Sequence, residues 1–141
     1  TNLCGGWVVV NKSVVEVVTE WDIVAARQLA RSEARKIGFN SVDQARITTV
    51  VSEFAKGLYL YALAGEIVIE RLEGGSQTGI RVLAIDKSNE AQDVRNLKGS
   101  KFSTTEGLGV GLSRLKRLMD DLEIQYNLEK GTTIIVEKWL K

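Results

Sequence analysis

The sequence predicts an α/β fold, a two-layer sandwich in which about three helices cover one face of a mixed, mainly antiparallel sheet of about five strands. The expected elements follow one another in the order strand, helix, helix, strand, strand, helix, strand, strand. The last four strands form two consecutive pairs, each joined by a short segment with turn residues, which is typical of hairpins. Two capping boxes, in residues 19–22 and 41–44, mark the starts of the first two helices.

The composition indicates one globular domain. The chain has 141 residues, of which 44% are hydrophobic and 26% are charged, and a chain of this size can bury a sizeable core. Residues 1–6 lack a pattern and are expected to form a tail, whereas residues 7–141 form the single domain. The net charge of +1 gives no reason to expect a nucleic acid or an anionic membrane as a partner.

Missing residue types exclude several chemistries. The chain has no histidine, which removes the commonest general base and most transition-metal sites, and we expect no metal-binding residues. Cys4 is the only cysteine, so an internal disulfide is excluded and the chain fits a reducing compartment. The apolar runs stay well below the roughly 18 residues that span a bilayer. We therefore expect a cytoplasmic protein.

The first strand and the first helix are predicted from a change of pattern near Thr19. Residues 7–18 are rich in valine, which favours a strand, and Asn11 and Lys12 are a candidate turn within it. Thr19 and the acid three residues later start a helix, which Gly38 ends. The apolar stripe of this helix consists of Ile23, Ala26, Leu29, Ala30, Ala34 and Ile37.

The second helix is expected to run from Ser41 to about Ala62, with Gly65 just past its end. One of its faces carries Ala45, Thr48, Val51, Ala55, Leu58 and Ala62. Two hairpins follow in the sequence, separated by polar residues 87–106, and a loop of that length is usually functional or mobile. The expected strands are residues 66–72 and 79–85, joined by a loop over residues 73–78, and residues 122–128 and 132–140.

A glycine-rich segment leads into the third helix. It consists of Gly107, Leu108, Gly109, Val110, Gly111 and Leu112. An apolar stripe continues from Leu108 through Leu115 to Leu122 at helical spacing, so the glycines lie at a helix start, where free N–H groups and the helix dipole suit a phosphate. On its own, such a segment is more often only a flexible connection. Its GxGxG spacing, without a strand immediately before it, also differs from the dinucleotide-binding fingerprint.

Two carboxylates are candidates for chemistry. Glu53 lies within the second helix, and its neighbour one turn later is Gly57, a residue that costs about 1 kcal/mol relative to alanine inside a helix. Asp86 ends an apolar strand, where a carboxylate can accept a hydrogen bond from an amino group of a ligand. Each residue also has a plainer interpretation, Glu53 as a solvated helical side chain and Asp86 as the start of a turn.

Six segments, in the correct order, resemble the RsbT family. They are residues 21–29, 42–49, 59–62, 102–112, 116–120 and 131–132, so the resemblance spans roughly residues 8–140. This family consists of small serine/threonine switch kinases of the stressosome, related to anti-sigma factor kinases and to GHKL ATPases. The resemblance implies a Bergerat-type fold, ATP as the nucleotide, and a STAS-domain protein as the partner, with a downstream phosphatase as a further partner.

The resemblance also implies roles for particular residues. Glu53 stands where the family has a helical Glu that positions or activates the attacking group. Asp86 matches the strand-end Asp that recognises the adenine amino group, and Thr132 matches the residue that completes the adenine pocket. The phosphate-binding segment corresponds to Gly107, Leu108, Gly109, Val110, Gly111 and Leu112.

Two parts of the sequence depart from the family pattern. Gly57 stands where the family has an Asn that binds Mg²⁺, and Ser88 and Glu90 replace the two glycines that follow Asp86 in the DxGxG motif. Because Mg²⁺ neutralises charge during phosphoryl transfer, we expect an RsbT-like regulatory protein whose kinase activity is weak or lost. The alternative is an active kinase that transfers the γ-phosphate of ATP to a Ser or Thr of a STAS-domain partner, with Glu53 accepting the hydroxyl proton.

Overall fold

The computed structural model describes residues 6–62, 64–87, 111–127 and 131–140, and in these ranges it contains five strands and three helices in the expected order. The strands are β1 (Val8–Val17), β2 (Gly65–Gly74), β3 (Gln77–Asp86), β4 (Asp121–Asn127) and β5 (Gly131–Trp139). The helices are α1 (Glu20–Ile37), α2 (Ser41–Tyr61) and α4 (Leu112–Leu118).

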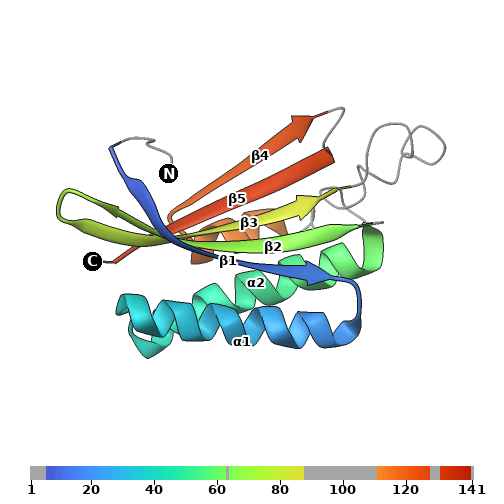
Figure 1. Ribbon diagram of the computed structural model, residues 1–141, viewed down its shortest axis with the longest axis horizontal. Coiled ribbons are helices and arrows are strands. Elements are labelled where there is room, and N and C mark those ends of the chain that lie inside the picture. The colour runs from blue at the N-terminus through green and yellow to red at the C-terminus, as the bar shows by residue number, and fades with distance from the viewer. Residues whose placement is uncertain (1–5, 63, 88–110, 128–130, 141) are drawn as a thin grey trace.

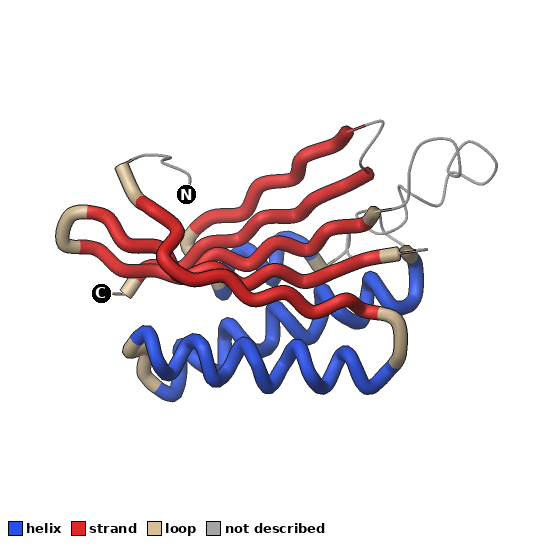
Figure 2. The backbone as a smooth tube through the Cα atoms, in the orientation of Figure 1, coloured by secondary structure: helices blue, strands red, loops and turns tan. Residues whose placement is uncertain are grey.

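The five strands form one open sheet in the order β1-β2-β3-β5-β4. All four pairings are antiparallel, so the described sheet is antiparallel throughout and not mixed. α1 and α2 run along one face of the sheet, and α4 lies on the same side (Figure 1). The two layers are clearest in Figure 2, where the helices cover one face only. The predicted α/β sandwich is therefore confirmed.

A single core lies between the two layers. Ala26, Ala30 and Ala34 on α1 are fully buried, as the predicted stripe requires, and their small side chains allow the helix to approach its neighbours closely. Phe54 of α2 is among the largest side chains that are fully buried. The sheet and α4 complete the core with Ile67, Ile69, Ile80, Val82, Ala84, Leu115, Met119, Ile134 and Val136.

β1 continues through the position where a turn was expected. The register against β2 shifts between Val9 and Asn11, which is the mark of a β-bulge. The side-chain amide of Asn11 donates to Glu33 Oε1 on α1 at 3.3 Å. The predicted turn at Asn11 and Lys12 is therefore wrong, because one extra residue is absorbed within the ladder and does not reverse the chain.

α1 begins as predicted, with Thr19 as its N-cap. The carboxylate of Asp22 accepts hydrogen bonds from the backbone N–H groups of Val18 and Thr19, both at 2.8 Å. These bonds lower the pKa of the Asp22 carboxyl below its ordinary value, and the bond from the backbone N–H of Thr19 has the largest effect. Gly38 ends the helix in the left-handed conformation, with φ of 117°.

The N-terminus of α2 differs from the prediction by one residue. The N-cap is Asn40, whose side-chain oxygen accepts the N–H of Asp43 at 2.8 Å, and Ser41 is the first helical residue. Asn is among the strongest N-cap residues, so it takes the capping position from the adjacent serine. Four residues of the predicted face are buried, namely Thr48, Val51, Ala55 and Leu58, whereas Ala45 is exposed. The buried face also includes Ile47, Val50 and Phe54 beside them.

The β2–β3 hairpin is tighter than expected. The ladder continues to the pair Gly74 and Gln77, which leaves a turn of two residues in place of a loop over residues 73–78. Gly75 in this turn has φ of 59°, a conformation that glycine adopts without strain. Leu122 was expected both in the stripe of the third helix and in the strand of residues 122–128. It belongs to β4, and the helix ends at Leu118.

The face of the sheet that carries no described helix has an ionic row at its centre. Arg81 of β3 contacts Glu70 of β2 at 3.2 Å and Glu137 of β5 at 2.9 Å, and all three side chains are largely buried by their neighbours. The three residues are register partners across the strands, so their charges alternate along the row. Such cross-strand pairs stabilise the chosen register.

Candidate functional site

Asp86 and Thr132 lie at one end of the sheet, on the side that faces the helices. Asp86 is 1% exposed at the end of β3, and Thr132 is 5% exposed near the start of β5. The next residue after β3, Lys87, donates its backbone N–H to Ala64 O at 2.7 Å, which secures the end of the strand. A buried carboxylate beside a hydroxyl can accept a hydrogen bond from an amino group of a ligand.

Close packing brings α2 against the same end of the sheet. Gly65 is the register partner of Asp86 on β2. A Cβ on Gly65 would lie 2.7 Å from Leu58 Cδ2 of α2 and 3.2 Å from Ile85 O, so a larger residue would require the Leu58 side chain to shift. The last turns of α2 are thereby held beside the strand that carries Asp86.

Glu53 lies on α2 in a groove of about 310 Å³ between α1 and α2. The lining residues are Arg27, Arg31, Ala45, Thr48, Thr49, Ser52 and Glu53. The sequence did not lead us to expect roles for Arg27 and Arg31. Their spacing of four residues on α1 places them on one face of that helix, but only the packing of α1 on α2 shows that this face meets Glu53. The groove thus combines a carboxylate, two guanidinium groups and three hydroxyls.

Gly57, one helical turn after Glu53, is buried in α2. It carries no side-chain atom that could bind a metal or a nucleotide. Among the described residues, no group of three His, Cys, Asp or Glu side chains is placed to hold a metal ion.

A second, larger groove of about 510 Å³ runs between the first turns of α2 and the end of α4. It is lined by Ser41, Val42, Ala45, Arg46, Thr49 and Leu118. Ala45 and Thr49 line both grooves, so the two hollows meet over the exposed side of α2. Val42 is 55% exposed in this region and presents an apolar side chain to solvent.

The glycine-rich segment is described only at its C-terminal end. Gly111 is the N-cap of α4, and its carbonyl oxygen accepts the N–H of Leu115 at 2.9 Å. Leu112 is the first helical residue and packs against the core. The prediction that the glycines lead into a helix therefore holds at Gly111, while the other candidates, Gly107, Leu108, Gly109 and Val110, lie outside the described residues, as do residues 88–106.

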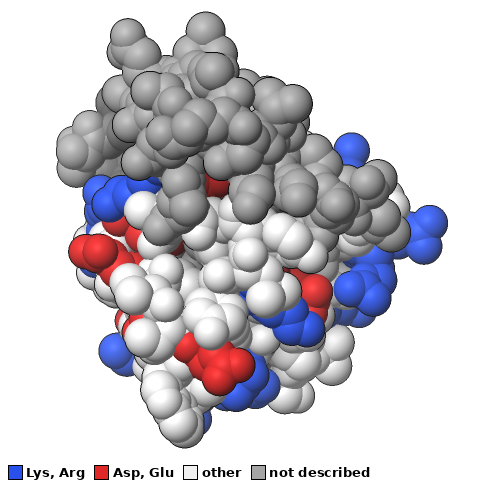
Figure 3. Space-filling model, turned by 90° about the vertical axis from the view of Figure 1, so that its right-hand side faces the viewer, with Lys and Arg blue, Asp and Glu red and all other residues white. Residues whose placement is uncertain are grey.

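The structure brings some of the predicted site residues together and leaves others apart. Asp86 and Thr132 share one end of the sheet, whereas Glu53 opens into the groove between α1 and α2. Figure 3 faces the end of the molecule where β3 ends, and over the described surface basic and acidic side chains are interspersed. Of the described helices, none is both long enough and apolar enough to cross a membrane.

Comparison with known proteins gives one strong similarity. The chain is 46% identical, over 131 residues, to the serine/threonine-protein kinase RsbT of Bacillus subtilis (strain 168). The match covers 93% of this chain and 98% of that protein. No protein-family model matches the chain.

Proposed function

Because this chain belongs to the RsbT family of serine/threonine-protein kinases, we propose that it is an RsbT-like regulatory protein that acts on a STAS-domain partner in the cytoplasm, with weak or lost kinase activity. The observation that carries the proposal is Gly57, which stands one turn after Glu53 where the family has its metal-binding Asn. A stressosome-type STAS protein and a downstream phosphatase are the partners that the family resemblance implies.

The described residues fit part of an ATP site. The buried Asp86 carboxylate can accept a hydrogen bond from the adenine amino group, with Thr132 beside it. Gly111 and Leu112 form the end of the segment that would face the phosphates, together with Gly107, Leu108, Gly109 and Val110. When bound, ATP would supply the phosphoryl group, and the chain's own contribution would be to bind and orient it.

The fit is poor where Mg²⁺ is needed. Mg²⁺ keeps most of its waters and takes few protein ligands, so the loss of one ligand removes a large share of its anchorage. Gly57 offers no ligand, and the two residues that follow it on α2, Leu58 and Tyr59, carry no carboxylate or amide. We therefore assign no Mg²⁺ site and expect phosphoryl transfer to be slow.

An active kinase remains the second candidate, and Glu53 favours it. Its carboxylate opens into a groove that a partner's Ser or Thr can enter, since the lining residues Ala45, Thr49 and Ser52 are small. In this case Glu53 would accept the hydroxyl proton as the oxygen bonds to the γ-phosphorus and ADP leaves. Arg27 and Arg31 would offset the added negative charge.

Phosphate transfer to a purified STAS-domain protein from the same genome distinguishes the two candidates. We expect the native chain to bind that protein in a calorimeter and to transfer labelled phosphate from ATP no faster than Glu53→Ala does. Rapid transfer that disappears in Glu53→Ala would establish an active kinase. Failure of the native chain to bind any STAS-domain protein of that genome would refute the proposed partner.

A further inference from the structure

Lys138 is a buried lysine on the helix-facing side of β5. Ile134 and Val136 on the same side of the strand are fully buried core residues, and the register partner of Lys138 on β3 is the fully buried Ile80. The side chain of Lys138 is only 10% exposed. An ammonium group in such surroundings is costly unless the protein supplies its partners.

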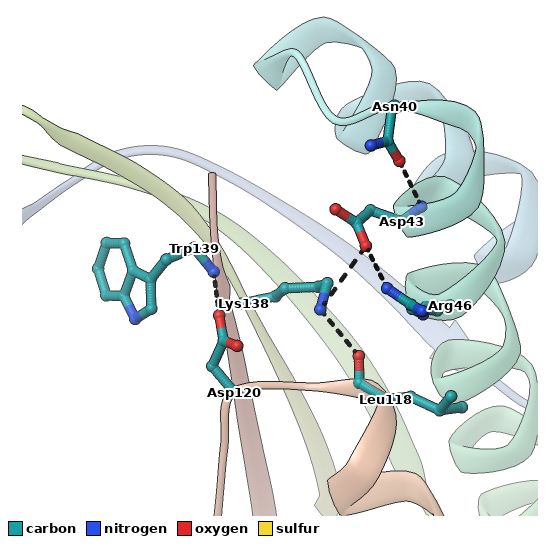
Figure 4. Close-up of polar contacts among 7 residues, drawn as sticks. All are labelled: Asn40, Asp43, Arg46, Leu118, Asp120, Lys138 and Trp139. Atoms are coloured by element: carbon teal, nitrogen blue, oxygen red, sulfur yellow. Dashed lines mark hydrogen bonds and ion pairs between the residues drawn. The ribbon is translucent and has the colours of Figure 1, made fainter. Parts of the chain in front are cut away.

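The ammonium of Lys138 joins the end of α4 to the start of α2 (Figure 4). It donates to the carbonyl oxygen of Leu118 at 3.1 Å and lies 3.8 Å from Asp43 Oδ1. Leu118 is the last residue of α4, and its carbonyl has no partner within the helix. A cation at this end also interacts favourably with the helix dipole.

Asp43 is itself held firmly at the start of α2. Its backbone N–H donates to the side chain of the N-cap Asn40, and its carboxylate contacts Arg46 Nη1 at 3.0 Å. The carboxylate therefore meets Lys138 in a fixed orientation, between two cations (Figure 4).

A second attachment holds the chain just after α4. The backbone N–H of Asp120 donates to Glu137 O at 2.8 Å, and the Asp120 carboxylate accepts the N–H of Trp139 at 2.7 Å. These bonds flank Lys138 on β5, so the C-terminal end of α4 is tied to three consecutive residues of that strand. The only fully buried side chain within α4 is that of Leu115.

The position of this end determines the position of Gly111. α4 has seven residues, and at 1.5 Å per residue its two ends are about 10 Å apart. Traced from its C-terminal end, α4 runs toward the end of the sheet where β3 ends (Figures 1 and 2). Asp86 and Thr132 lie at that end. A tilt of α4 about its C-terminal end would displace Gly111 and Leu112 most.

We propose that Lys138 is a positioning residue of the nucleotide site: it holds the carbonyl of Leu118 and the carboxylate of Asp43, and so fixes α4, with Gly111 at its start, against α2 and β5. The inference rests on the proposed function for the role of Gly111. The contacts of Lys138 are directional, whereas an apolar side chain of similar length would fill the same space without orienting the helix. A buried ion pair is weak support for stability alone, since apolar replacement is often neutral.

Three variants test the proposal. Lys138→Met keeps the length and apolar packing of the side chain but removes the ammonium. Lys138→Arg keeps a cationic donor. Lys36→Met is the matched control, because Lys36 pairs with Glu33 at 3.6 Å on α1 with a side chain that is 67% exposed.

Hydrogen exchange and ATP titration are the two measurements. In Lys138→Met we expect exchange of the α4 amides to accelerate by about tenfold, while the α1 amides and the melting temperature change little. The Kd for ATP should rise by about tenfold, an effect of the size known for couplings through packed elements. Lys138→Arg and Lys36→Met should behave like the native chain in both measurements.

The outcomes separate the inference from the proposed function. Unchanged α4 exchange in Lys138→Met would overturn the positioning role, whatever ATP does. Faster α4 exchange with an unchanged Kd would also overturn it, because α4 would then not position the site. A native chain that binds no ATP refutes nucleotide binding, and with it the positioning of a nucleotide site, although α4 exchange still shows whether Lys138 holds the helix.

A second variant covers the case in which Lys138→Met does not fold. Asp43→Asn weakens only the second contact of Lys138, so it should show the same changes in α4 exchange and Kd at smaller size. The absence of these changes would count against the proposal.

Discussion

Asp86 and Thr132 are direct register partners across β3 and β5, and both are almost completely buried at the end of the sheet. The antiparallel pairing brings a carboxylate and a hydroxyl together that are 46 positions apart in the sequence. A carboxylate accepts hydrogen bonds and a hydroxyl can donate or accept them, so these two groups offer polar contacts to a ligand at this end of the sheet.

Replacement of the carboxylate should therefore impair nucleotide binding selectively. In Asp86→Asn, one charged acceptor becomes an amide that also presents donors, and we expect ATP affinity to fall by roughly 1.5–3 kcal/mol, or more than tenfold. Equilibrium dialysis with ATP and with GTP measures the loss and any change of base preference. Thr78→Val on β3, far from this end of the strand, serves as the control. Equal ATP affinity of a folded Asp86→Asn variant would show that Asp86 does not recognise the base.

Restoring the missing oxygen ligand should create a dependence on Mg²⁺. We expect Gly57→Asn to raise the affinity for ATP roughly tenfold in the presence of Mg²⁺, about 1.4 kcal/mol, and to change it little without the metal. Gly57→Ala is the matched control, since it adds a Cβ to the same buried helical position without an oxygen. An equal gain in both variants would point to helix stabilisation rather than to a metal ligand. Phosphate transfer need not recover, because Ser88 and Glu90 still replace the two glycines of the DxGxG motif.

The cap of α1 should make stability depend on acid pH. The Asp22 carboxyl has a pKa below its ordinary value, chiefly because the N–H of Thr19 donates to the ionised form. A lowered pKa in the folded state means that the unfolded state binds protons more readily, so the contribution is full above the ordinary Asp pKa of about 3.9 and is lost as the pH falls through the folded pKa. Urea unfolding from pH 7 to pH 3 should show a steeper loss for the native chain than for Asp22→Asn. Parallel profiles of the two proteins would contradict this role of Asp22.

Alanine substitutions at two glycines of the β2–β3 hairpin should lower the free energy of unfolding by different amounts. A Cβ on Gly79 would lie 2.5 Å from Trp139 Cε3 and 2.8 Å from Lys138 O, so Gly79→Ala must displace β5 and should cost about 3 kcal/mol. Gly75 has open space around it but a φ of 59°, so Gly75→Ala should cost only about 1 kcal/mol from the left-handed backbone. Urea midpoints of the two variants give the comparison. A larger loss for Gly75→Ala would mean that turn strain, and not the contact with Trp139, dominates at this end of the sheet.

Local patterns determined most of the fold. The valine-rich run of β1, the alanine stripe of α1, the cap at Thr19 and the glycine at the end of α1 each act over a few residues, so sequence spacing alone predicts them. Errors arose where two local signals competed. Asn40 outcompeted Ser41 as the N-cap, and the Asn11 region became a bulge because the strand could keep its pairing with β2 and donate to Glu33.

The site depended more on the tertiary structure. The sequence and the family resemblance singled out Glu53, Asp86 and Thr132, since each residue type suits a role by its own chemistry. Arg27 and Arg31 could not be found in this way, because the sequence pattern of an exposed helical arginine is the same whether the side chain is surrounded by solvent or lines a groove. Only the packing of α1 against α2 brings them to Glu53.

Lys138 shows the same division most clearly. By sequence it is a charged residue near the end of an alternating strand, where a solvated side chain is the usual expectation. The sheet register turns it toward the helices, and the path of the chain through α4 brings the Leu118 carbonyl within 3.1 Å of its ammonium. The sequence by itself determined the elements and the chemical groups that they carry. Which groups meet was decided by the tertiary structure, because contacts between residues distant in the chain depend on the register and packing of whole elements.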